Sequence, residues 1–426
     1  MRFTSRLSLL VALAFLCTSA AFPSGFMIPE QGAKASAMAG AFTAIADDPS
    51  AIFYNVAGIA QQRRLSGIAG ATFITFDNSF QGDPNDELTS GTTGRYDSHL
   101  FVVPNGYAIV PIGENLTFGV GSYAGYGLRT DWKDPWVGRF VSQDVNLKTA
   151  SVMPALAWQT SDGRLAVGAG LEYRRARVTL ERNNGALSPF TGRIHDVANI
   201  YLSGEWGSSM GWGAGLLFKA NDRLRFGLSH RAAMDIDIEG DATFTQIPTG
   251  NPQFDAIVGS QLPPNQAIST TIPFPAHTAV GIGWVGDAWD LDFDITHTSW
   301  SRFETLVVEF AQTPAVNLVR PQNWEDTMSF RVGGNRRVTE AWDIRLGALY
   351  DENPQPTDRV GPLLPDADRI GVSFGAGYHH GPWIVDAGLL FLEFMERSTD
   401  GTSAEGFNGT YRTGANLYFL NLGVRF

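Results

Sequence analysis

The side chains of this 426-residue chain that could take part in acid–base chemistry are its seven histidines. None of them lies in a nucleophile motif such as G-x-S-x-G, and the adjacent pair falls in a predicted turn. They are His99, His195, His230, His277, His297, His379 and His380. The sequence therefore disfavours a hydrolase, and we expect no enzymatic activity.

Arginines inside predicted strands offer a different chemistry, the binding of an anionic group. Arg174 and Arg177 fall in one predicted strand and Arg345 falls in another. Charge-assisted hydrogen bonds from arginine to a carboxylate are strong, so these three residues are candidate lumen contacts for an acidic ligand. The alternative is that each arginine only balances neighbouring charges in a wet interior.

Four carboxylates recur at every second position, at Asp235, Asp237, Glu239 and Asp241. Carboxylate oxygens are the ligands that calcium prefers. The same spacing is typical of the solvated face of a strand, and this is the interpretation we favour. We therefore predict no metal site and no cofactor.

Two long polar stretches, 126–147 and 240–273, carry apolar side chains at high density. In the first, three aromatic residues recur at a four-residue spacing, which would place them on one face of a helix. Exposed apolar residues of this density indicate a groove for an acyl or aryl ligand, although the two stretches could instead pack on each other as a lid. The candidate groove residues are Leu128, Trp132, Trp136, Phe140, Phe244, Phe254, Ile257 and Leu262.

These residues need a scaffold, and the sequence predicts one built from β-strands. In the segment WDLDFDITHT (289–298) apolar side chains alternate with aspartates, and ANLYFLNLGVRF (415–426) alternates in the same way. Strands of this kind have one apolar and one polar face, as in a membrane barrel with lipid outside and a wet lumen inside. A soluble β-sandwich is the alternative.

The composition favours the barrel. The chain is 12% aromatic, contains 47 glycines, has a formal net charge of -12 and a mean hydropathy near zero. No window approaches the roughly 20 apolar residues that a membrane-spanning helix needs. The acidic balance and the scattered basic residues also argue against nucleic-acid binding.

The two ends of the chain point to a bacterial outer membrane. Residues 1–21 have the basic, apolar and small-residue regions of a secretory signal peptide. They include Cys17, the only cysteine, so we expect no thiol chemistry in the mature protein. The terminal aromatic residue, Phe426, resembles the signal by which outer-membrane barrels are recognised, and we expect it to contact the barrel-assembly machinery.

The predicted connections between strands alternate between two lengths, six short and seven long. Fourteen antiparallel strands follow from this count, with both chain ends on the short-turn side, as outer-membrane barrels have. The short turns lie at 113–115, 162–163, 221–222, 286–287, 339–340 and 381–382. The long connections cover roughly 78–97, 126–147, 182–204, 240–273, 310–323, 352–367 and 397–410.

A barrel of this size would leak unless something filled its lumen, because about eight strands already close around packed side chains. Residues 22–62 precede the first strand, are rich in small residues and lack alternation. We therefore predict a signal peptide over 1–21, a plug of short helices over 22–62 and an all-β transmembrane barrel over 63–426.

The predicted plug resembles the hatch of the FadL/TodX family of outer-membrane channels for hydrophobic compounds. The segments that carry the resemblance are Gly25-Phe26, Pro29-Glu30-Gln31, Met38 to Phe42, Ala46 to Ala51, Phe53-Tyr54-Asn55, Trp132, WVGRF (136–140) and Phe426. The resemblance implies passive, ligand-gated uptake by a monomer, from an extracellular groove to a lumen pocket and past the hatch into outer-membrane lipid. It implies long-chain fatty acids as the ligand, with hydrocarbons or aromatic compounds as the alternative and a general diffusion porin as a weaker one.

The same resemblance makes Phe26, Phe53, Asn55 and Ala57 candidate hatch and gate residues. The family usually has Asn-Pro-Ala where this chain has Asn55-Val56-Ala57. Proline would fix φ and remove an N–H group, so the geometry of this turn is left open by the sequence.

Proline and glycine also mark a weak place in the predicted wall. Pro104 interrupts predicted strand two, Pro154 interrupts strand four, and strand three between them contains Gly119 and Gly121. Proline cannot donate to a ladder, and glycine permits a kink. We expect strand three to bend inward and leave a lateral opening toward the bilayer; the alternative is that these small residues simply face the plug.

Overall fold

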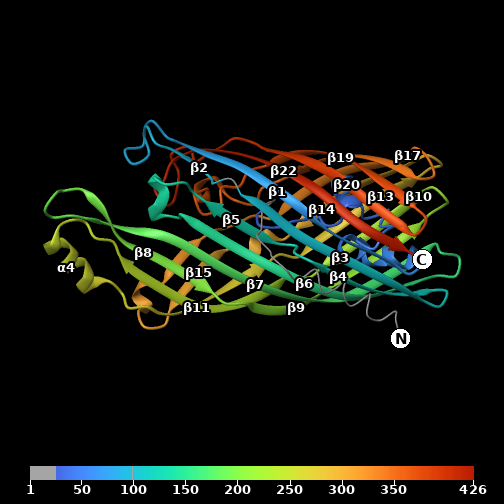
Figure 1. Ribbon diagram of the computed structural model, residues 1–426, viewed down its shortest axis with the longest axis horizontal. Coiled ribbons are helices and arrows are strands. Elements are labelled where there is room, and N and C mark those ends of the chain that lie inside the picture. The colour runs from blue at the N-terminus through green and yellow to red at the C-terminus, as the bar shows by residue number, and fades with distance from the viewer. Residues whose placement is uncertain (1–24, 98) are drawn as a thin grey trace.

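The computed structural model describes residues 25–97 and 99–426, which form a closed antiparallel barrel of fourteen strands (Figure 1). β1 (Ser66–Gly82) pairs along its whole length with β22 (Gly409–Arg425) and so joins the two edges of the sheet. The predicted fold class is therefore confirmed. The predicted signal peptide and Cys17 lie outside the described residues. Within those residues, no helix is long and apolar enough to cross a membrane.

Several strands of the wall are interrupted, so the chain is divided into more elements than the barrel has strands. The strands are β1 (Ser66–Gly82), β2 (Thr93–Arg95), β3 (Leu100–Ile112), β4 (Leu116–Tyr123), β5 (Gly127–Asp131), β6 (Asp144–Gln159), β7 (Leu165–Leu187), β8 (Ile194–Gly204), β9 (Gly207–Lys219), β10 (Leu224–Arg231), β11 (Met234–Gln246), β12 (Gln266–Phe274), β13 (His277–Val285), β14 (Trp289–Thr298), β15 (Thr305–Phe310), β16 (Leu318–Pro321), β17 (Thr327–Arg337), β18 (Trp342–Asp351), β19 (Arg369–His380), β20 (Trp383–Phe394), β21 (Arg397–Ser398) and β22 (Gly409–Arg425). The helices are α2 (Ala33–Ser36), α3 (Ala51–Tyr54), η2 (Val56–Gln61), η3 (Val137–Phe140), α4 (Pro252–Gln261), η4 (Trp300–Arg302), η5 (Pro314–Val316) and η6 (Thr357–Arg359).

The alternation predicted for the strands holds in the structure, with the apolar face outward. In β14, Leu291 and Phe293 are exposed, whereas Asp292 and Asp294 are each only 1% exposed. β22 behaves in the same way, with Leu422 exposed and Asn421 buried. An apolar exterior around a polar interior is the reverse of a soluble protein and matches a barrel surrounded by lipid.

A ring of tryptophans marks one boundary of the membrane. The exposed residues Trp158, Trp284, Trp289, Trp342 and Trp383 lie at strand ends beside the short turns. These turns lie at the same end of the barrel as the C-terminus (Figure 1). Aromatic girdles and short turns together are typical of the periplasmic boundary of outer-membrane barrels. The long connections and α4 then lie on the extracellular side.

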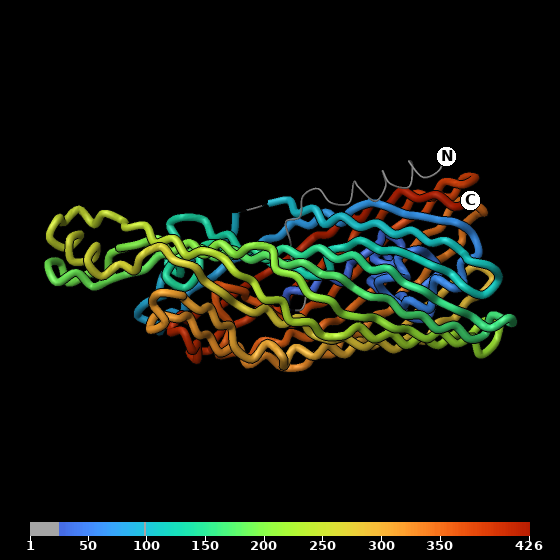
Figure 2. Tube along the Cα trace, turned by 90° about the horizontal axis from the view of Figure 1, so that it is seen from below, coloured from blue at the N-terminus to red at the C-terminus, as the bar shows by residue number. Residues whose placement is uncertain are grey.

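The predicted boundaries of two long connections are wrong, because much of 182–204 and 240–273 is strand. β7 continues to Leu187, β8 returns from Ile194, and β11 and β12 form a further hairpin that extends beyond the barrel body (Figure 2). Here the outer face is polar while the inner face stays apolar. In β11, for example, Asp237 is exposed on the outer face and its neighbour Ile238 is buried on the inner face. The lipid-facing signal used to recognise strands is therefore lost above the membrane.

The four alternating carboxylates lie on this outer polar face. Asp235 forms an ion pair with Arg302 at 2.9 Å, and Asp237 accepts a hydrogen bond from Thr271. No group of three His, Cys, Asp or Glu side chains in the described part of the chain is placed to hold a metal ion. The arrangement is that of a solvated strand face.

Residues 25–61 lie inside the barrel toward its periplasmic end, where α2, α3 and η2 are surrounded by the wall (Figure 2). Nearly all of their side chains are buried. We call residues 25–31 the hatch finger and residues 33–61 the hatch body, because they are held by different parts of the wall.

Candidate functional site

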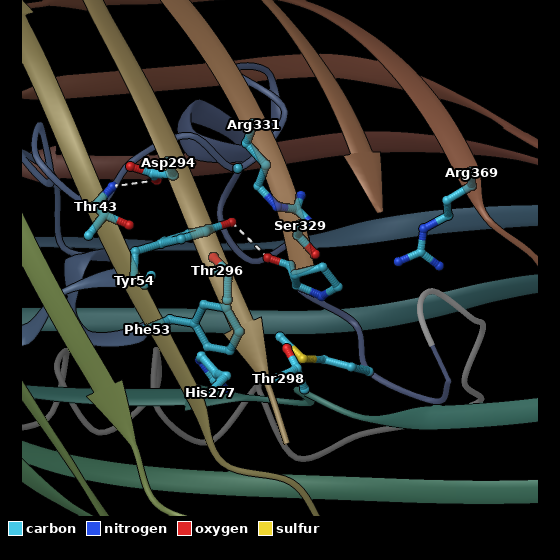
Figure 3. A pocket seen from close by; sticks show the side chains of 14 residues that line it. Thr43, Phe53, Tyr54, His277, Asp294, Thr296, Thr298, Ser329, Arg331 and Arg369 are labelled. Carbon is cyan, nitrogen blue, oxygen red and sulfur yellow. Dashed lines mark hydrogen bonds between the residues drawn. The ribbon is translucent and has the colours of Figure 1, made fainter. Parts of the chain in front are cut away.

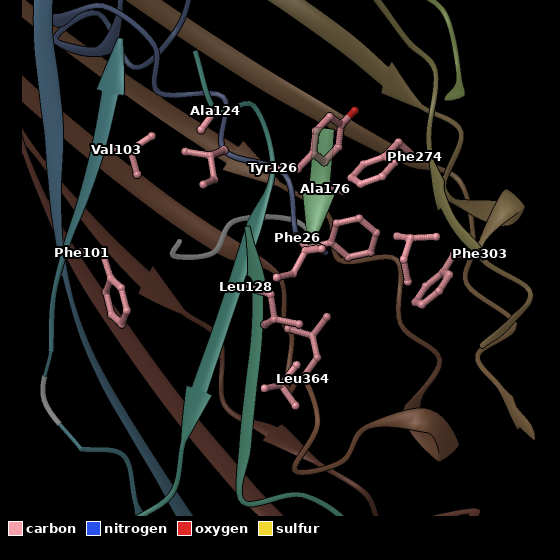
Figure 4. Close-up of a cluster of buried hydrophobic side chains, with 14 of the residues drawn as sticks. Phe26, Phe101, Val103, Ala124, Tyr126, Leu128, Ala176, Phe274, Phe303 and Leu364 are labelled. Atoms are coloured by element: carbon pink, nitrogen blue, oxygen red, sulfur yellow. The ribbon is translucent and has the colours of Figure 1, made fainter. Parts of the chain in front are cut away.

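An apolar pocket occupies the lumen on the extracellular side of the hatch. Its floor is Phe26 of the hatch finger, and its walls come from strands on several sides of the barrel (Figure 4). The lining residues are Phe26, Leu128, Val145, Leu147, Val178, Leu180, Leu202, Gly204, Ile238, Glu239, Ile268, Thr270, Ile272, Phe303, Leu306, Val308, Gln322, Trp324, Leu363 and Leu364. A concave, largely apolar site with few polar groups is the usual form of a site for a small hydrophobic molecule.

Phe26 is held in place by aromatic rings on all sides. Its ring centroid lies 4.8 Å from that of Trp300 and 5.6 Å from that of Phe303, both in edge-to-face geometry. The rings of Phe274 and Trp324 each lie at 5.8 Å, and that of Tyr126 lies at 6.1 Å. Edge-to-face pairs of this kind contribute about 0.5–1.5 kcal/mol each beyond area burial, so the closed position of Phe26 is well defined.

Two arginines stand at the extracellular mouth of the pocket. On β7 every second residue faces inward, and Arg182 follows the pocket residue Leu180 on that face. Arg320 on β16 precedes the pocket residue Gln322 in the same way. The two arginines donate to consecutive backbone carbonyls at the end of η3, Arg182 to Phe140 at 3.2 Å and Arg320 to Val141 at 3.1 Å.

The charges of this pair are only partly balanced. The positive charge of Arg320 acts on Arg182, and the nearest opposing charge is Glu405, whose carboxylate is 3.4 Å from Arg320. The single negative charge of Glu405 thus faces two positive guanidinium groups that repel each other. Such a pair is well placed to accept a further anionic group by charge-assisted hydrogen bonds. The sequence reasoning missed both residues, although the inward face of β7 would have pointed to Arg182.

A second, more polar cavity, the lower chamber, lies on the periplasmic side of Phe26 between the hatch and the wall (Figure 3). Its hydroxyl-bearing residues include Thr296 and Ser329, and its charged residues are Arg331, Arg369 and Asp294. The complete lining is Met27, Pro29, Gly40, Thr43, Phe53, Tyr54, His277, Ala279, Asp294, Thr296, Thr298, Ser329, Arg331 and Arg369. Because Phe26 lines the pocket and Met27 lines the chamber, the hatch finger separates the two spaces.

The hatch body is fixed to the wall by carboxylates of β14. Asp294 accepts the backbone N–H groups of Phe42 and Thr43, at 2.8 and 2.9 Å. Asp292 accepts those of Ala44 and Ile45, at 3.1 and 2.9 Å. Four consecutive buried N–H groups are thereby satisfied by two side chains of one strand.

The turn at the Asn-Val-Ala segment is formed without proline. Asn55 is extended and caps η2 by accepting the N–H of Ala57 at 3.1 Å, while its amide donates to the carbonyl of Thr43 at 2.8 Å. Val56 is the first residue of η2. At the first position of a helix the backbone N–H has no partner within the helix, so proline and other residues can both occupy it. Val56 therefore allows the same turn, which is fixed by the cap from Asn55.

The hatch finger is bonded to a break in the wall. Strand three of the sequence prediction is divided between β4 and β5, and at the break the N–H of Ile28 donates to Gly125 and that of Gly127 donates to Phe26, both at 2.8 Å. Gln31 adds a bond from its amide to the carbonyl of Ala124 at 2.9 Å.

Among the described residues, the wall beside this break has no ladder between β3 and β5. The pairing of β3 with β4 ends at Gly106 and Ser122. On the extracellular side, contact resumes where Asp97 donates to Asp131 at 2.8 Å. Between these points residues 100–105 of β3 pair with β1, and β5 pairs with β6. Pro104 lies in this stretch of β3, and Pro154 lies where the register between β6 and β7 is interrupted. Gly119 and Gly121 face the hatch residue Ile52 below the break.

The predicted groove residues are separated in the structure. Leu128 lines the apolar pocket, and Phe244 packs against the cluster around it. Phe254 is buried on α4 with Val197 and Val258, while Ile257 on the same helix is exposed and Leu262 follows it. These α4 residues lie at the extracellular tip, away from the pocket lining.

The predicted helical face over 132–140 is wrong. Only residues 137–140 are helical, and Trp132 forms a β-bridge with Tyr96. Trp132 and Trp136 are buried and stack face to face at 4.0 Å among the aromatic side chains of Phe80, Phe407 and Tyr411. Phe140 instead packs under the guanidinium of Arg139. The aromatic spacing here serves packing between loops and strand ends.

The three predicted lumen arginines have separate environments. Arg174 is buried beside Tyr126 and is paired with Glu172 at 2.7 Å. Arg345 is paired with Asp386 at 2.5 Å, far from the pocket lining. The lumen position expected for Arg177 is wrong, because odd-numbered residues of this part of β7 face outward, and Arg177 donates to the carbonyl of Gly204.

Phe53, the remaining predicted gate residue, lines the lower chamber beneath the finger. Its carbonyl accepts a hydrogen bond from Arg231 at 2.7 Å, and its ring lies 5.1 Å from that of Tyr123 next to the break in the wall. Ala57 is fully buried in η2. Phe53 therefore connects the hatch body to the strand that is interrupted, whereas the backbone of Ala57 lies beside Gly168 of β7 and Gly215 of β9.

Two carboxyl groups of the hatch have strongly altered acidity. Burial raises the pKa of Glu30 to about 7, against the opposing effect of Arg331 and Arg369, and neither of its oxygens has a hydrogen-bond partner among the described residues. Burial likewise raises the pKa of Asp48 to about 6. Next to it, the pKa of Asp47 is lowered, because its ion pair with Lys34 at 2.7 Å outweighs its burial.

The sequence matches known proteins along almost its whole length. Residues 14–426 match the profile of the outer membrane protein transport protein family (OMPP1/FadL/TodX). The chain is 25% identical to the long-chain fatty acid transport protein of Escherichia coli O6:H1, over 98% of each chain. It is 27% identical to the 47 kDa outer membrane protein of Pasteurella multocida, over 90% of this chain and 89% of that one.

Solved structures show the same fold. A FadL homologue of Pseudomonas aeruginosa superposes with a TM-score of 0.82 at 23% identity, covering 94% of this chain and 99% of that one. The toluene transporter TbuX of Ralstonia pickettii superposes with a TM-score of 0.70 at 19% identity, covering 95% and 99%.

Proposed function

The chain belongs to the OMPP1/FadL/TodX family of outer-membrane transport proteins, and from this premise we propose that it takes up long-chain fatty acids through the apolar pocket. The protein is an outer-membrane β-barrel that transports hydrophobic compounds. Uptake is passive, and the proposal assigns the chain no catalytic role. The expected monomer and its insertion through Phe426 belong to the same proposal; Phe426 is exposed, and its N–H donates to Leu65.

The observation that carries the choice of ligand is the arginine pair at the mouth of an otherwise apolar pocket. An acyl chain in the pocket would bury apolar surface at about 0.8 kcal/mol per methylene. Its carboxylate would then lie near Arg182 and Arg320, which share only Glu405. The relatives named as long-chain fatty acid transport proteins agree with this assignment.

A hydrocarbon is the second candidate. The pocket lining is almost entirely apolar, and the toluene transporter TbuX shares the fold. A hydrocarbon would use the same pocket without engaging the arginines. An aqueous diffusion porin is disfavoured by the hatch, which fills the lumen with buried side chains.

We propose a route in three steps for the ligand. It is captured among apolar side chains on the extracellular side, with Phe244 and the α4 residues as candidates, and then enters the pocket above Phe26. Displacement of the hatch finger, with Phe53 and the Asn55 turn as a fixed base, opens the way past the break between β4 and β5. The stretch of β3 around Pro104, which pairs with β1 but not with β4, is the proposed lateral exit to the bilayer.

Binding measurements with two ligands test the proposal. Arg182→Gln and Arg320→Gln together should weaken oleate binding about tenfold or more, because each charge-assisted hydrogen bond contributes about 1.5–3 kcal/mol. The affinity for dodecane should not change. Arg412→Gln is the matched control, since Arg412 pairs with Glu396 on the exposed surface. Unchanged oleate affinity in the double variant would point to the hydrocarbon instead.

A further inference from the structure

The outward face of β7 changes from apolar to basic near the extracellular end of the barrel body. Counted from the periplasmic turn, its large outward side chains are those of Val167, Leu171, Tyr173, Arg175 and Arg177. Val167, Leu171 and Tyr173 are exposed, as expected for a stretch that crosses lipid and ends in an aromatic residue. The two arginines come directly after this stretch, so they lie at the extracellular boundary of the membrane.

The neighbouring strand β6 brings a third cation to the same level. β6 and β7 lie side by side in the wall (Figure 1), and Lys148 is the register partner of Arg177. The register partner of Arg175 is Ala150, whose side chain is too small to separate the cations. Like charges directly opposite each other destabilise a sheet, so an anion bound here would relieve a repulsion. We call Lys148, Arg175 and Arg177 the basic patch.

The basic patch lacks the partners that other cations at this end of the barrel have. Four such cations form ion pairs at 2.6–3.0 Å, in Arg129–Asp131, Lys133–Asp97, Arg302–Asp235 and Arg412–Glu396. Within residues 25–97 and 99–426, no ion pair includes a cation of the patch. Glu205 follows Gly204, to which Arg177 is bonded, and the acidic face of β11 is one strand further away. Three cations against the one carboxylate of Glu205 leave an excess of two positive charges.

Both arginines of the patch are held at the surface. Arg177 donates from Nε to the carbonyl of Gly204 at 2.9 Å and from Nη2 to Oγ of Ser203 at 3.5 Å. A guanidinium group has five N–H donors, so these bonds fix its position and leave donors for a ligand. The guanidinium of Arg175 lies 5.3 Å from the ring centroid of Trp206, which is exposed. Tryptophan is enriched at membrane–water interfaces, so this contact places Arg175 at the level of the lipid headgroups.

We propose that the basic patch binds a phosphate monoester of a glycolipid in the outer leaflet of the outer membrane. The patch points outward at the level where clustered basic side chains bind anionic lipid headgroups. A phosphate monoester carries close to two negative charges at neutral pH, which matches the excess charge of the patch, whereas the phosphodiester of an ordinary phospholipid carries one. Arginine binds phosphate oxygens through two parallel hydrogen bonds, and lysine adds a point charge. The site is separate from the apolar pocket, so the inference does not depend on the transported compound.

Lipid binding to the detergent-purified protein tests the patch. The probe is lipid A with two phosphate monoesters, and its dephosphorylated form is the comparison. Native mass spectrometry measures the fraction of protein that carries the lipid over a range of lipid concentrations. Lys148→Gln, Arg175→Gln and Arg177→Gln together should weaken binding of the phosphorylated form about a hundredfold, because each basic residue near an anionic lipid contributes about fivefold. Binding of the dephosphorylated form should be weak and equal in both proteins.

Lys133→Gln, Arg302→Gln and Arg412→Gln together form the matched control. They remove three cations from the same end of the barrel, and each of these is paired with a carboxylate. This variant should keep the wild-type affinity for the phosphorylated form. Equal losses in the two triple variants, or equal wild-type affinity for both forms of lipid A, would overturn the proposal.

A double variant is measured if the triple variant of the patch does not fold. Lys148→Gln/Arg175→Gln leaves the bond from Arg177 to Gly204 intact and should weaken binding about thirtyfold. Inorganic phosphate is added as a competitor in a separate titration, and we expect lipid binding to stay unchanged. Displacement of lipid A by inorganic phosphate would assign the patch to a soluble anion and overturn the lipid site.

Discussion

The hatch finger carries a buried carboxyl group, that of Glu30, whose oxygens have no hydrogen-bond partner in the part of the chain that the structure describes. Glu30 is 2% exposed, and Arg331, Arg369 and Asp351 are the charged groups that act on it. Arg331 and Arg369 already bind Asp351, at 2.8 and 2.7 Å. Because both arginines are already paired with Asp351, their effect on the pKa of Glu30 is smaller than that of burial, which raises it.

Glu30 should therefore make the hatch more stable as the pH falls. Its pKa is about 7 in the folded protein against 4.5 in the unfolded chain, so the folded state binds the proton more tightly. The loss of stability caused by the charged Glu30 carboxylate is complete above pH 7 and disappears as the pH falls toward 4.5. One pKa unit is about 1.4 kcal/mol, which puts the penalty at roughly 3 kcal/mol at pH 8.

Glu30→Gln should raise the unfolding temperature at pH 8 and leave it nearly unchanged at pH 4.5. The measurement is heat-induced loss of the compact electrophoretic form in detergent at each pH. Asp48 and Asp366 also have a pKa of about 6, so both proteins retain some pH dependence, and the difference between them isolates Glu30. Parallel curves for the two proteins would contradict the assignment.

At the scale of the elements, the strands that cross the lipid could be predicted from sequence because both of their faces have fixed environments. β14 and β22 alternate strictly for this reason. Above the membrane the outer face meets water, and β8, β11 and β12 looked like loops. The break between β4 and β5 also depends on the hatch, since Gly125 and Gly127 bond to the finger.

The candidate site was only partly predictable for a related reason. Leu128 and the gate residue Phe26 were found from apolar density and from the family resemblance. Arg182 and Arg320 were missed, because their approach depends on the pairing of β7 and on the position of the end of η3. Local spacing also gave Trp132 and Trp136 a ligand role, whereas they pack with side chains from β1 and β22.

The start of η2 allows a test of how the hatch turn is encoded. Asn55 has φ -154° and ψ 103°, an extended conformation, and a residue before proline is biased toward extended backbone and away from the α region. Val56→Pro should therefore be tolerated and should stabilise the protein by up to about 1 kcal/mol through the unfolded state. Ala57→Pro should destabilise it by about 1–3 kcal/mol, because it removes the N–H that Asn55 accepts. Unfolding temperatures of both variants check this order; equal losses would mean that the turn needs the Val56 N–H.

At the scale of the whole molecule, the hatch body and the hatch finger are bonded to different parts of the barrel. The body is fixed to β14, β17 and β19, through Asp292 and Asp294, through Arg331 to the carbonyl of Ala39, and through Ser373 to that of Ala37. The finger is bonded to the broken strand and to Asp366. A molecule built in this way can displace the finger for a ligand while the body keeps the lumen closed to water.

Loss of the body's attachment should therefore produce a leak that a hydrophobic ligand does not. In Asp292→Ala/Asp294→Ala the four N–H groups of residues 42–45 lose the two carboxylate oxygens that accept them, at about 1–3 kcal/mol for each buried group left unpaired. We expect frequent large conductance steps in planar bilayers. Asp290→Ala is the matched control, because Asp290 lies on the same strand face but pairs with Arg337. Wild-type conductance with saturating oleate should stay at the low level of that control, since in the proposed route the finger opens toward lipid. Large steps on addition of oleate would instead mean that the whole hatch leaves the lumen during transport.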